Sequence, residues 1–510
     1  MQRPLPIVFV LGVSTLVACD GPRERLDAGA AEDSGPQPDA PGLDAPPSPL
    51  DAAEPLLDAA TTTGLASGVT LDGLAIFQGV RVELARGGVV SSERNAPVLA
   101  GRSAVVRAYL SAATYPRTVQ GELEIREGAS VVAVHSATAT LTRASDDADA
   151  ASVLAFDVPA SELTTGASLA VRIVDPAGES AGASHPARLP RDGTALSLGA
   201  RDDGEGLHLV LVPMRWDSDG SGRLPDVSDA WLMQVRALLT ALYPIVDLRI
   251  DVHEVVPWSG GLTWSGSVDF GEINAALLDL RASDRAPQGA YYYGLVAPDA
   301  DFDSYCGGSC VTGQSYVTDA PEDGDFRVGS GVGFGTEDSA GTLAHEVGHE
   351  HGRYHAPCDT SGADADYPYR GGEIGVWGYD SRTRRFQAPS STYDFMGYCD
   401  PQWISDYTWS AMFERTVAVS ALAAPARSEV LVVRLDRGAA IAVGRRTLRA
   451  PHSDTLVPYV FRDARRRALA RGIAPAIVQS HSDEKLALLP VPPPGATEVV
   501  LGGVLLPLER

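Results

Sequence analysis

HEVGHEHGRYH, the stretch at residues 345–355, decides how this sequence is interpreted, because it holds four of the ten histidines in 510 residues. Residues i and i+4 lie on one face of a helix, so His345 and His349 can present two imidazoles to one ion. Glu346 then sits beside that ion without having to ligate it. Paired imidazoles of this kind are typical zinc ligands. The spacing therefore predicts a helix that carries a zinc site.

A third ligand has to come from beyond the straight helix. Gly352 carries no side-chain penalty at positive φ, so it can end the helix and bring His355 back toward the ion. His351 and His355 also have i, i+4 spacing, but Gly352 follows His351 where a glutamate would be needed, and it breaks that helix. We therefore expect His345, His349 and His355 as the ligands, and His351 as a solvent-facing or supporting neighbour.

The pattern HExxHxxGxxH at residues 345–355 resembles, at every specified position, the zinc motif of the metzincin clan of metallopeptidases. The resemblance covers about residues 205–420. That clan has a Met-containing turn beneath the metal, and Met396 in the stretch YDFMGY at 393–398 resembles that Met. Tyr398, two residues later, resembles a tyrosine that approaches the zinc in astacin- and serralysin-like members.

This resemblance implies a zinc-dependent endopeptidase. Glu346 would take the proton of a zinc-activated water, and Tyr398 would help to hold the oxyanion. The substrate would lie extended along an edge strand of the sheet. Some relatives silence their zinc with an upstream cysteine, but none lies between Cys19 and Cys306, which excludes a cysteine switch in the N-terminal domain.

Strands and helices are expected to alternate around the motif, which predicts a central α/β domain over residues 205–422 with a mixed sheet. Helices are expected near residues 232–242, 273–280, 337–350 and 405–421. Strands are expected at residues 208–213, 248–255, 290–296, 311–317 and 327–334.

Two β-rich domains are expected on either side of the central one. Short strand-like runs separated by turns predict an antiparallel β-sandwich over residues 64–200. These runs are Leu74–Leu84, Ala104–Leu110, Gly121–Glu127, Val131–Leu141, Ser152–Val158 and Ser168–Val174. A smaller β-rich C-terminal domain is expected over residues 423–510.

The N-terminal segment predicts export. Residues 1–18 combine an early arginine with a short apolar run, the order typical of a cleaved signal peptide. Leu16–Cys19 resembles a bacterial lipobox, which implies lipid attachment at Cys19, so that the chain touches a membrane only through a lipid anchor. The acidic, proline-rich segment 19–63 reads as a tether. The alternative is an ordinary secreted protein in which Cys19 is incidental.

Four cysteines remain if Cys19 is lipidated. An even number in an exported chain predicts two disulfides, with free thiols as the alternative, and the sequence alone allows three pairings. We favour Cys358–Cys399, because this bridge would fasten the segment of the third ligand to the Met-containing turn. Cys306–Cys310 would then close a small loop.

The charge composition limits the classes of partner that can be expected for this protein. The 41 Lys and Arg against 66 Asp and Glu give a formal net charge of −25, and no long basic stripe appears, so nucleic-acid binding is disfavoured. Calcium is a weaker candidate cofactor. Residues 217–222 begin like a calcium loop, but Ser228 stands where an EF-hand needs glutamate. Asp299, Asp301 and Asp303 could ligate calcium or only solvate a loop.

The sequence therefore predicts an exported Zn²⁺ endopeptidase that acts on proteins or glycoproteins. One alternative is a zinc-bearing surface adhesin that has lost proteolysis. Another is a zinc hydrolase that acts on a cell-wall or glycan amide.

Overall fold

The computed structural model describes residues 64–180, 182–262, 268–307, 310–360, 362–422, 427–449 and 451–508. The expected signal peptide, the lipidation site at Cys19 and the tether lie outside the described residues. Apart from Gly307, the described residues form one compact unit. Among them, no helix combines the length and the apolar character needed to cross a membrane.

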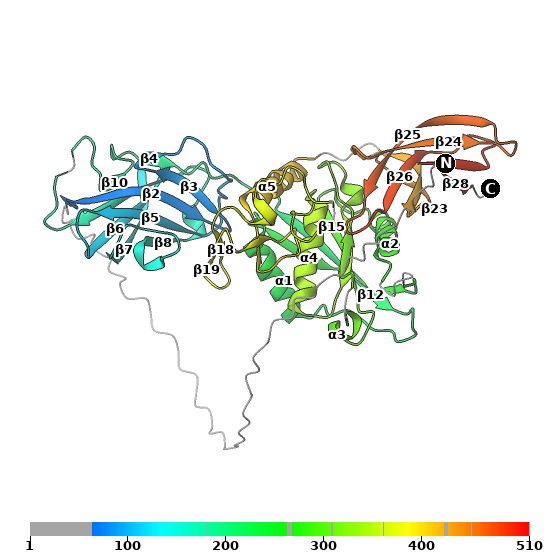
Figure 1. Cartoon of the computed structure of the whole chain (residues 1–510), viewed down its shortest axis with the longest axis horizontal. Helices are drawn as coiled ribbons and strands as arrows, with labels where there is room; N and C mark the ends of the chain where they lie inside the picture. The colour runs from blue at the N-terminus through cyan, green and yellow to red at the C-terminus, as the bar shows by residue number, and fades with distance from the viewer. Residues whose placement is uncertain are drawn as a thin grey trace, which may run out of the picture. The chain divides into compact units, whose positions relative to one another are not determined.

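The N-terminal part consists of two antiparallel sheets (Figure 1) that share one core. Their side chains alternate between inside and outside, as in β6, where Val119, Leu123 and Ile125 are buried. The first sheet has the order β4-β3-β2-β5-β8, with bounds β2 (Val69–Phe77), β3 (Arg81–Arg86), β4 (Val89–Val90), β5 (Ala104–Ala112) and β8 (Leu154–Val158). The second has the order β1-β9-β6-β7, with β10 and β11 also on β9; its bounds are β1 (Gly64–Leu65), β6 (Arg117–Glu127), β7 (Ser130–Leu141), β9 (Ala167–Asp175), β10 (Arg188–Leu189) and β11 (Leu196–Ser197). Two short 3-10 helices, η1 (Ala150–Ser152) and η2 (Ala160–Glu162), flank β8.

The single strand expected at Leu74–Leu84 is wrong, because the chain reverses there and forms β2 and β3. Gly79 lies in this turn, and a Cβ at that position would come within 2.1 Å of the Trp409 ring. The Gly79 carbonyl accepts a hydrogen bond from Trp403 Nε1 at 2.8 Å. The turn therefore packs against the central part of the chain, a long-range contact that the local run of apolar residues does not reveal.

The central part is built on a mixed sheet with the order β13-β12-β15-β17-β16, and β14 continues beside β12. All pairs in it are parallel except β16, which is the antiparallel edge strand next to β17. The strand bounds are β12 (Leu207–Trp216), β13 (Leu248–Val252), β14 (Val256–Trp258), β15 (Ala290–Val296), β16 (Gly313–Ser315) and β17 (Val328–Val332). The helices are α1 (Asp229–Leu242), α2 (Phe270–Ser283), α3 (Phe302–Tyr305), α4 (Glu337–Glu350) and α5 (Asp406–Ser420), with η3 (Gly324–Phe326) and η4 (Arg370–Gly372).

Both faces of this sheet are covered, which explains why its strands are apolar throughout. Alternate residues of β12, such as Leu209 and Leu211, face the core shared with α1 and α4. The intervening Val210 and Val212 face a second core shared with α2. Figure 1 shows α1 and α4 on one side of β15 and α2 on the other. Small pairs of strands complete this part: β18 (Gly378–Asp380) with β19 (Arg385–Gln387), and β20 (Tyr393–Asp394) with β21 (Gln402–Trp403).

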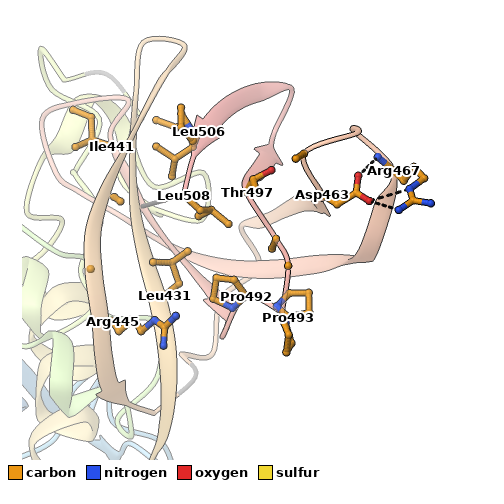
Figure 2. Close-up of a pocket in the computed structure, with 18 of the residues that line it drawn as sticks. Leu431, Ile441, Arg445, Asp463, Arg467, Pro492, Pro493, Thr497, Leu506 and Leu508 are labelled. Atoms are coloured by element: carbon orange, nitrogen blue, oxygen red, sulfur yellow. Dashed lines mark hydrogen bonds and ion pairs between the residues drawn. The ribbon is translucent and has the colours of Figure 1, made fainter. Parts of the chain in front are cut away.

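The C-terminal part is one antiparallel sheet with the order β23-β22-β26-β25-β24-β27-β28. Val430 and Val432 of β22 join the core around α2, while Leu431 and Val433 face a separate core. A cleft of about 1300 Å³ opens between the β23 strand, the Asp463–Arg467 turn and the Pro492–Pro494 segment (Figure 2). The strand bounds are β22 (Ser428–Asp436), β23 (Ala439–Leu448), β24 (Leu456–Arg462), β25 (Ala468–Val478), β26 (Lys485–Pro490), β27 (Glu498–Leu501) and β28 (Val504–Pro507).

Candidate active site

Helix α4 carries the first two histidines of the motif. Its N-terminus is capped by Thr336, whose hydroxyl accepts a hydrogen bond from the Ser339 N–H at 3.2 Å. His345 and His349 lie one turn apart near its C-terminal end, and both are buried. The helix thus presents two imidazoles side by side, as the i, i+4 spacing requires.

Gly352 reverses the chain directly after α4. Its φ is +80°, in the left-handed region that favours glycine. The N–H of Gly352 donates to the carbonyl of His349 at 2.8 Å, and the N–H of Arg353 donates to the carbonyl of Gly348 at 3.1 Å, which satisfies carbonyls at the helix end. The reversal returns His355 to the face that bears the other two imidazoles.

The three motif histidines meet at their Nε2 atoms. The Nε2 of His349 lies 3.2 Å from that of His345 and 3.2 Å from that of His355. The opposite nitrogens of two rings are held by the backbone, with His345 Nδ1 2.8 Å from the Phe395 carbonyl and His349 Nδ1 2.6 Å from the Arg353 carbonyl. These contacts require Nδ1–H on both rings and leave each Nε2 with a lone pair toward the common centre.

This arrangement fits a zinc ion. Nitrogen ligands at the usual zinc distance of about 2.0–2.1 Å in a tetrahedron lie roughly 3.3–3.4 Å apart. The two distances from His349 Nε2, both 3.2 Å, are close to that separation. Burial lowers the pKa of His345 to about 3 and holds that of His349 well below its ordinary value. Both imidazoles are therefore neutral, which is the form that ligates a metal.

Met396 packs against α4 at Gly348, between the first two motif histidines. A Cβ at Gly348 in α4 would come within 2.4 Å of Met396 Sδ, so the glycine lets the sulfur pack directly on the helix. Asp394, which the sequence analysis did not single out, accepts hydrogen bonds from the N–H of Met396 at 2.9 Å and from the N–H of Ser405 at 3.0 Å. This buried carboxylate ties the turn to the beginning of α5.

The segment that holds His355 is fastened to this turn. The Ala356 N–H donates to the Met396 carbonyl at 3.0 Å, and the disulfide Cys358–Cys399 links the same two segments. The second disulfide is Cys306–Cys310. The structure thus contains the pairing that we favoured among the three possible ones.

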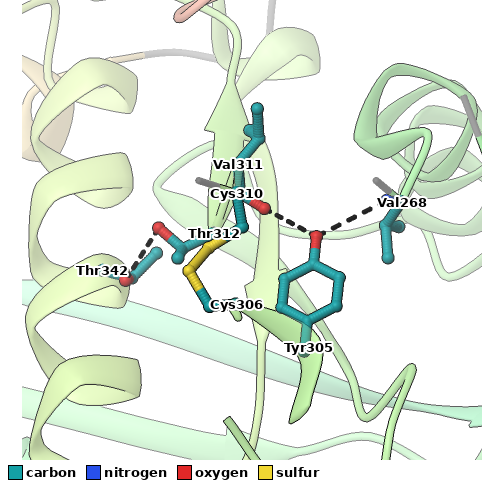
Figure 3. Close-up of a disulfide and its surroundings, with 7 residues drawn as sticks. All are labelled: Val268, Tyr305, Cys306, Cys310, Val311, Thr312 and Thr342. Carbon is teal, nitrogen blue, oxygen red and sulfur yellow. Dashed lines mark hydrogen bonds between the residues drawn. A yellow bond between two sulfur atoms is a disulfide. The ribbon is translucent and has the colours of Figure 1, made fainter. Parts of the chain in front are cut away.

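The Cys306–Cys310 disulfide lies at the beginning of the edge strand β16 (Figure 3). Next to it, Tyr305 donates its hydroxyl hydrogen to the Val311 carbonyl at 2.7 Å, and Thr342 of α4 donates to Thr312 at 3.3 Å. A Cβ on Gly313 would come within 2.9 Å of Glu346 Cγ. The disulfide and these hydrogen bonds therefore hold the edge strand close to the candidate catalytic glutamate.

Glu346 is 1% exposed and lies beside the histidine group. Burial pushes its pKa upward, but the interactions with His481, His345 and Ser480 together leave the pKa below its ordinary value. Tyr398 lies on the other side, with its hydroxyl 3.3 Å from His355 Nε2. The Tyr398 ring is partly exposed. Desolvation of the hydroxyl and the nearby Glu346 raise the pKa of Tyr398, so the hydroxyl stays protonated.

His481 joins the site and was missed by the sequence analysis. It lies in the turn between β25 and β26, and its ring supplies a fourth nitrogen to a group whose ligand atoms all lie within 4.8 Å of one another. Its Nε2 is 2.7 Å from Glu346 Oε1, and its Nδ1 contacts the Tyr398 hydroxyl. The preceding Ser480 donates its hydroxyl hydrogen to Glu346 Oε2 at 3.1 Å.

His351 is not solvent-facing, so that part of the expectation is wrong. It is 2% exposed, and its ring stacks on Tyr291 with 4.5 Å between centroids. Its Nδ1 lies 2.8 Å from the Val347 carbonyl. His351 supports the helix end from within the core and takes no part in the histidine group.

Three of the calcium candidates make other contacts. Asp217 pairs with Arg215 at 2.9 Å, and Asp219 pairs with Arg223 at 2.5 Å. Asp301 accepts a hydrogen bond from the Ser304 N–H at 2.8 Å as the cap of α3. In the described part of the chain, the four-histidine group is the only cluster of at least three His, Cys, Asp or Glu side chains placed to hold a metal.

Comparison with known proteins points to the same chemistry. No curated protein matches the chain. Residues 320–401, which contain α4, the three motif histidines and Met396, match the sequence model of the family Peptidase M66. This match supports a metallopeptidase.

Proposed function

We propose that this protein is an exported zinc-dependent endopeptidase of the metzincin type, which hydrolyses peptide bonds in extracellular proteins or glycoproteins. The observation that carries the proposal is the convergence of His345, His349 and His355 on one point beside the buried Glu346. The family match over residues 320–401 supports the same class of reaction.

Zinc held by these three imidazoles would act as a Lewis acid, which lowers the pKa of a water molecule and polarises a peptide carbonyl. Glu346 is the general base in this proposal, because its buried carboxylate lies beside the point where the three histidines converge. It takes a proton from the attacking water and gives it to the leaving amine. Tyr398 keeps its proton, so it can donate a hydrogen bond to the carbonyl oxygen as negative charge develops there.

Two further features of the proposal concern location. Two disulfides support export, because such bonds persist in oxidising compartments. Attachment through a lipid on Cys19 is the form of export that we propose, and secretion without an anchor is the alternative. In either form the chain would meet protein substrates outside the cytoplasm.

A second candidate function has a specific observation in its favour. Four imidazoles around one ion, with His481 as the fourth, resemble a closed structural zinc site, whereas catalytic zinc sites keep one position open. On this reading the protein is a zinc-bearing adhesin. The placement of Glu346 and Tyr398 at the same point favours the peptidase, since a structural site needs neither group.

The test uses the purified full chain and the variants Glu346→Gln and His349→Ala. We expect about one zinc per chain in the first variant and in the unmodified chain, and a loss of zinc in the second. Products from casein, a mucin-type glycoprotein and peptidoglycan are mapped by mass spectrometry, with and without a zinc chelator. Cleavage of peptide bonds that disappears with Glu346→Gln supports the proposal. Activity that survives this substitution, or a chain without zinc, contradicts it.

A further inference from the structure

The edge of the central sheet is already paired in this molecule. Strand β16 is the antiparallel edge strand, and residues 478–480 of the C-terminal part run antiparallel along its outer side. The N–H of Val317 donates to the Val478 carbonyl at 3.1 Å, and the N–H of Ser480 donates to the Ser315 carbonyl at 2.8 Å. An extended peptide that adds to a sheet edge makes the same backbone hydrogen bonds.

Side chains of the same segment cover the groups that would act on a substrate. Ser480 donates to one carboxylate oxygen of Glu346, and the His481 ring lies against the other. His481 also contacts the Tyr398 hydroxyl and reaches the three motif histidines. Segment 478–481 therefore occupies both the edge strand and the centre of the candidate active site.

The backbone at His481 lies in the left-handed region. Its φ is +58°, a conformation that is uncommon for residues other than glycine, although histidine adopts it several times more often than most. The ring is placed by its contacts to Glu346, to Tyr398 and to the histidine group.

The turn and the strands that bear it are held by different kinds of contact. Residues 479–484, QSHSDE, contain no apolar side chain. The strands on either side are anchored separately, with Ile477 of β25 and Leu486 of β26 in the core around α2. The tip is thus held by polar contacts and by stacking of the His481 ring on Tyr398, while the body of the C-terminal sheet is held by apolar packing.

We propose that the turn at residues 479–484 is a built-in inhibitor: segment 478–480 takes the place of a peptide substrate along β16, and His481 supplies a fourth nitrogen to the metal. Peptide hydrolysis then requires the turn to withdraw, which opens the metal position and frees Glu346 together. This inference rests on the proposed peptidase function. It gives the chain a form of latency that needs no cysteine.

The test compares the full chain with His481→Gly and with a control, Asp483→Ala, in the same turn. Glycine suits the left-handed backbone at position 481, so the first variant removes the ring without disturbing the fold. Asp483 is exposed, and its removal leaves the ring in place. Thermal unfolding checks that all three proteins are folded.

The first readout is the coordination of the metal. Each protein is loaded with Co²⁺, and its visible absorption is recorded before and after acetohydroxamate is added. We expect no spectral change in the unmodified chain and in Asp483→Ala, and a clear change in His481→Gly, because only the last has an open position. A similar response of all three proteins to acetohydroxamate overturns the inference and leaves the peptidase proposal intact.

The second readout is peptide hydrolysis by the zinc-loaded proteins on casein. We expect His481→Gly to cleave at least tenfold faster than the unmodified chain, with Asp483→Ala unchanged. A loss of activity in His481→Gly overturns the inference, because His481 would then assist the reaction. If His481→Gly binds acetohydroxamate at its metal but cleaves no peptide bond, the turn is confirmed as the fourth-position ligand and the peptidase proposal fails.

Discussion

Replacement of Gly352 by alanine tests how the third histidine is placed. Alanine at a φ of +80° carries a penalty of about 1–2 kcal/mol, because the Cβ crowds the following carbonyl. The new Cβ would also come within 2.6 Å of the backbone carbonyl oxygen of Thr318 and 2.4 Å of Arg415 Nη2. The arginine can swing away, whereas the carbonyl oxygen cannot move without its backbone segment.

We expect the main effect of Gly352→Ala to be a lower affinity for zinc. If about 2 kcal/mol is needed to restore the position of His355, the dissociation constant for zinc rises roughly 30-fold, since every 1.4 kcal/mol is a factor of ten. The affinity is measured by competition with a chromophoric chelator, and the stability of the metal-free protein by urea unfolding.

Gly341, which lies inside α4, offers a control for the glycine that follows this helix. A Cβ at Gly341 meets no atom within 4 Å, so Gly341→Ala should stabilise α4 by about 0.8–1.0 kcal/mol and leave zinc affinity unchanged. The reasoning about His355 is refuted if Gly352→Ala binds zinc within threefold of the unmodified chain. It is also refuted if the two alanine variants behave alike.

Two further predictions concern disulfides and pH. Serine at both Cys358 and Cys399 opens a loop with a sequence separation of 41, which should lower the free energy of unfolding by about 4 kcal/mol in the chain-entropy account and weaken zinc binding. Urea unfolding measures the stability, and chelator competition measures the zinc affinity. An unchanged zinc affinity would contradict a role of this disulfide in holding His355. Burial raises the pKa of Glu484 to about 7, although Arg434 lies 3.6 Å away and opposes this shift. Between about pH 4.5 and 7, the folded state therefore retains a proton that the unfolded state loses. As a result, this carboxyl lowers the stability of the folded protein as the pH rises through that range. In the metal-free protein, Glu484→Gln should therefore match the unmodified chain at pH 4 and exceed it by up to about 3 kcal/mol at pH 8, as measured by urea unfolding; equal stability at pH 8 would show that the buried carboxyl carries no such penalty.

Local spacing was enough to predict the helix and its two imidazoles. The bounds expected for α4 coincide with those observed, because a capping threonine begins the helix and a glycine follows its end. Gly352 also allowed the return of His355 to be predicted, since its effect lies within the same few residues. Features set by one turn of chain were therefore accessible from the sequence.

Long-range pairing was not accessible. His481 is a single histidine in a polar turn, and no spacing relates it to His345 or Glu346. Its position depends on the pairing of residues 478–480 with β16, which is a property of the whole topology. The same holds for Asp394, whose hydrogen bonds to Met396 and Ser405 become visible only when those segments meet. A polar turn of this composition is normally read as solvated surface.

The apolar layer around α2 has a practical consequence for anyone who trims the gene. Val432 and Leu488 from the last quarter of the chain interlock there with Ile273 and Leu277, so a stop codon placed after α5 would strip that helix of its cover. The shortened protein would expose this apolar surface to solvent and would be prone to aggregate. Enzymology on this protein is best carried out with its carboxyl-terminal portion intact and altered by single residues.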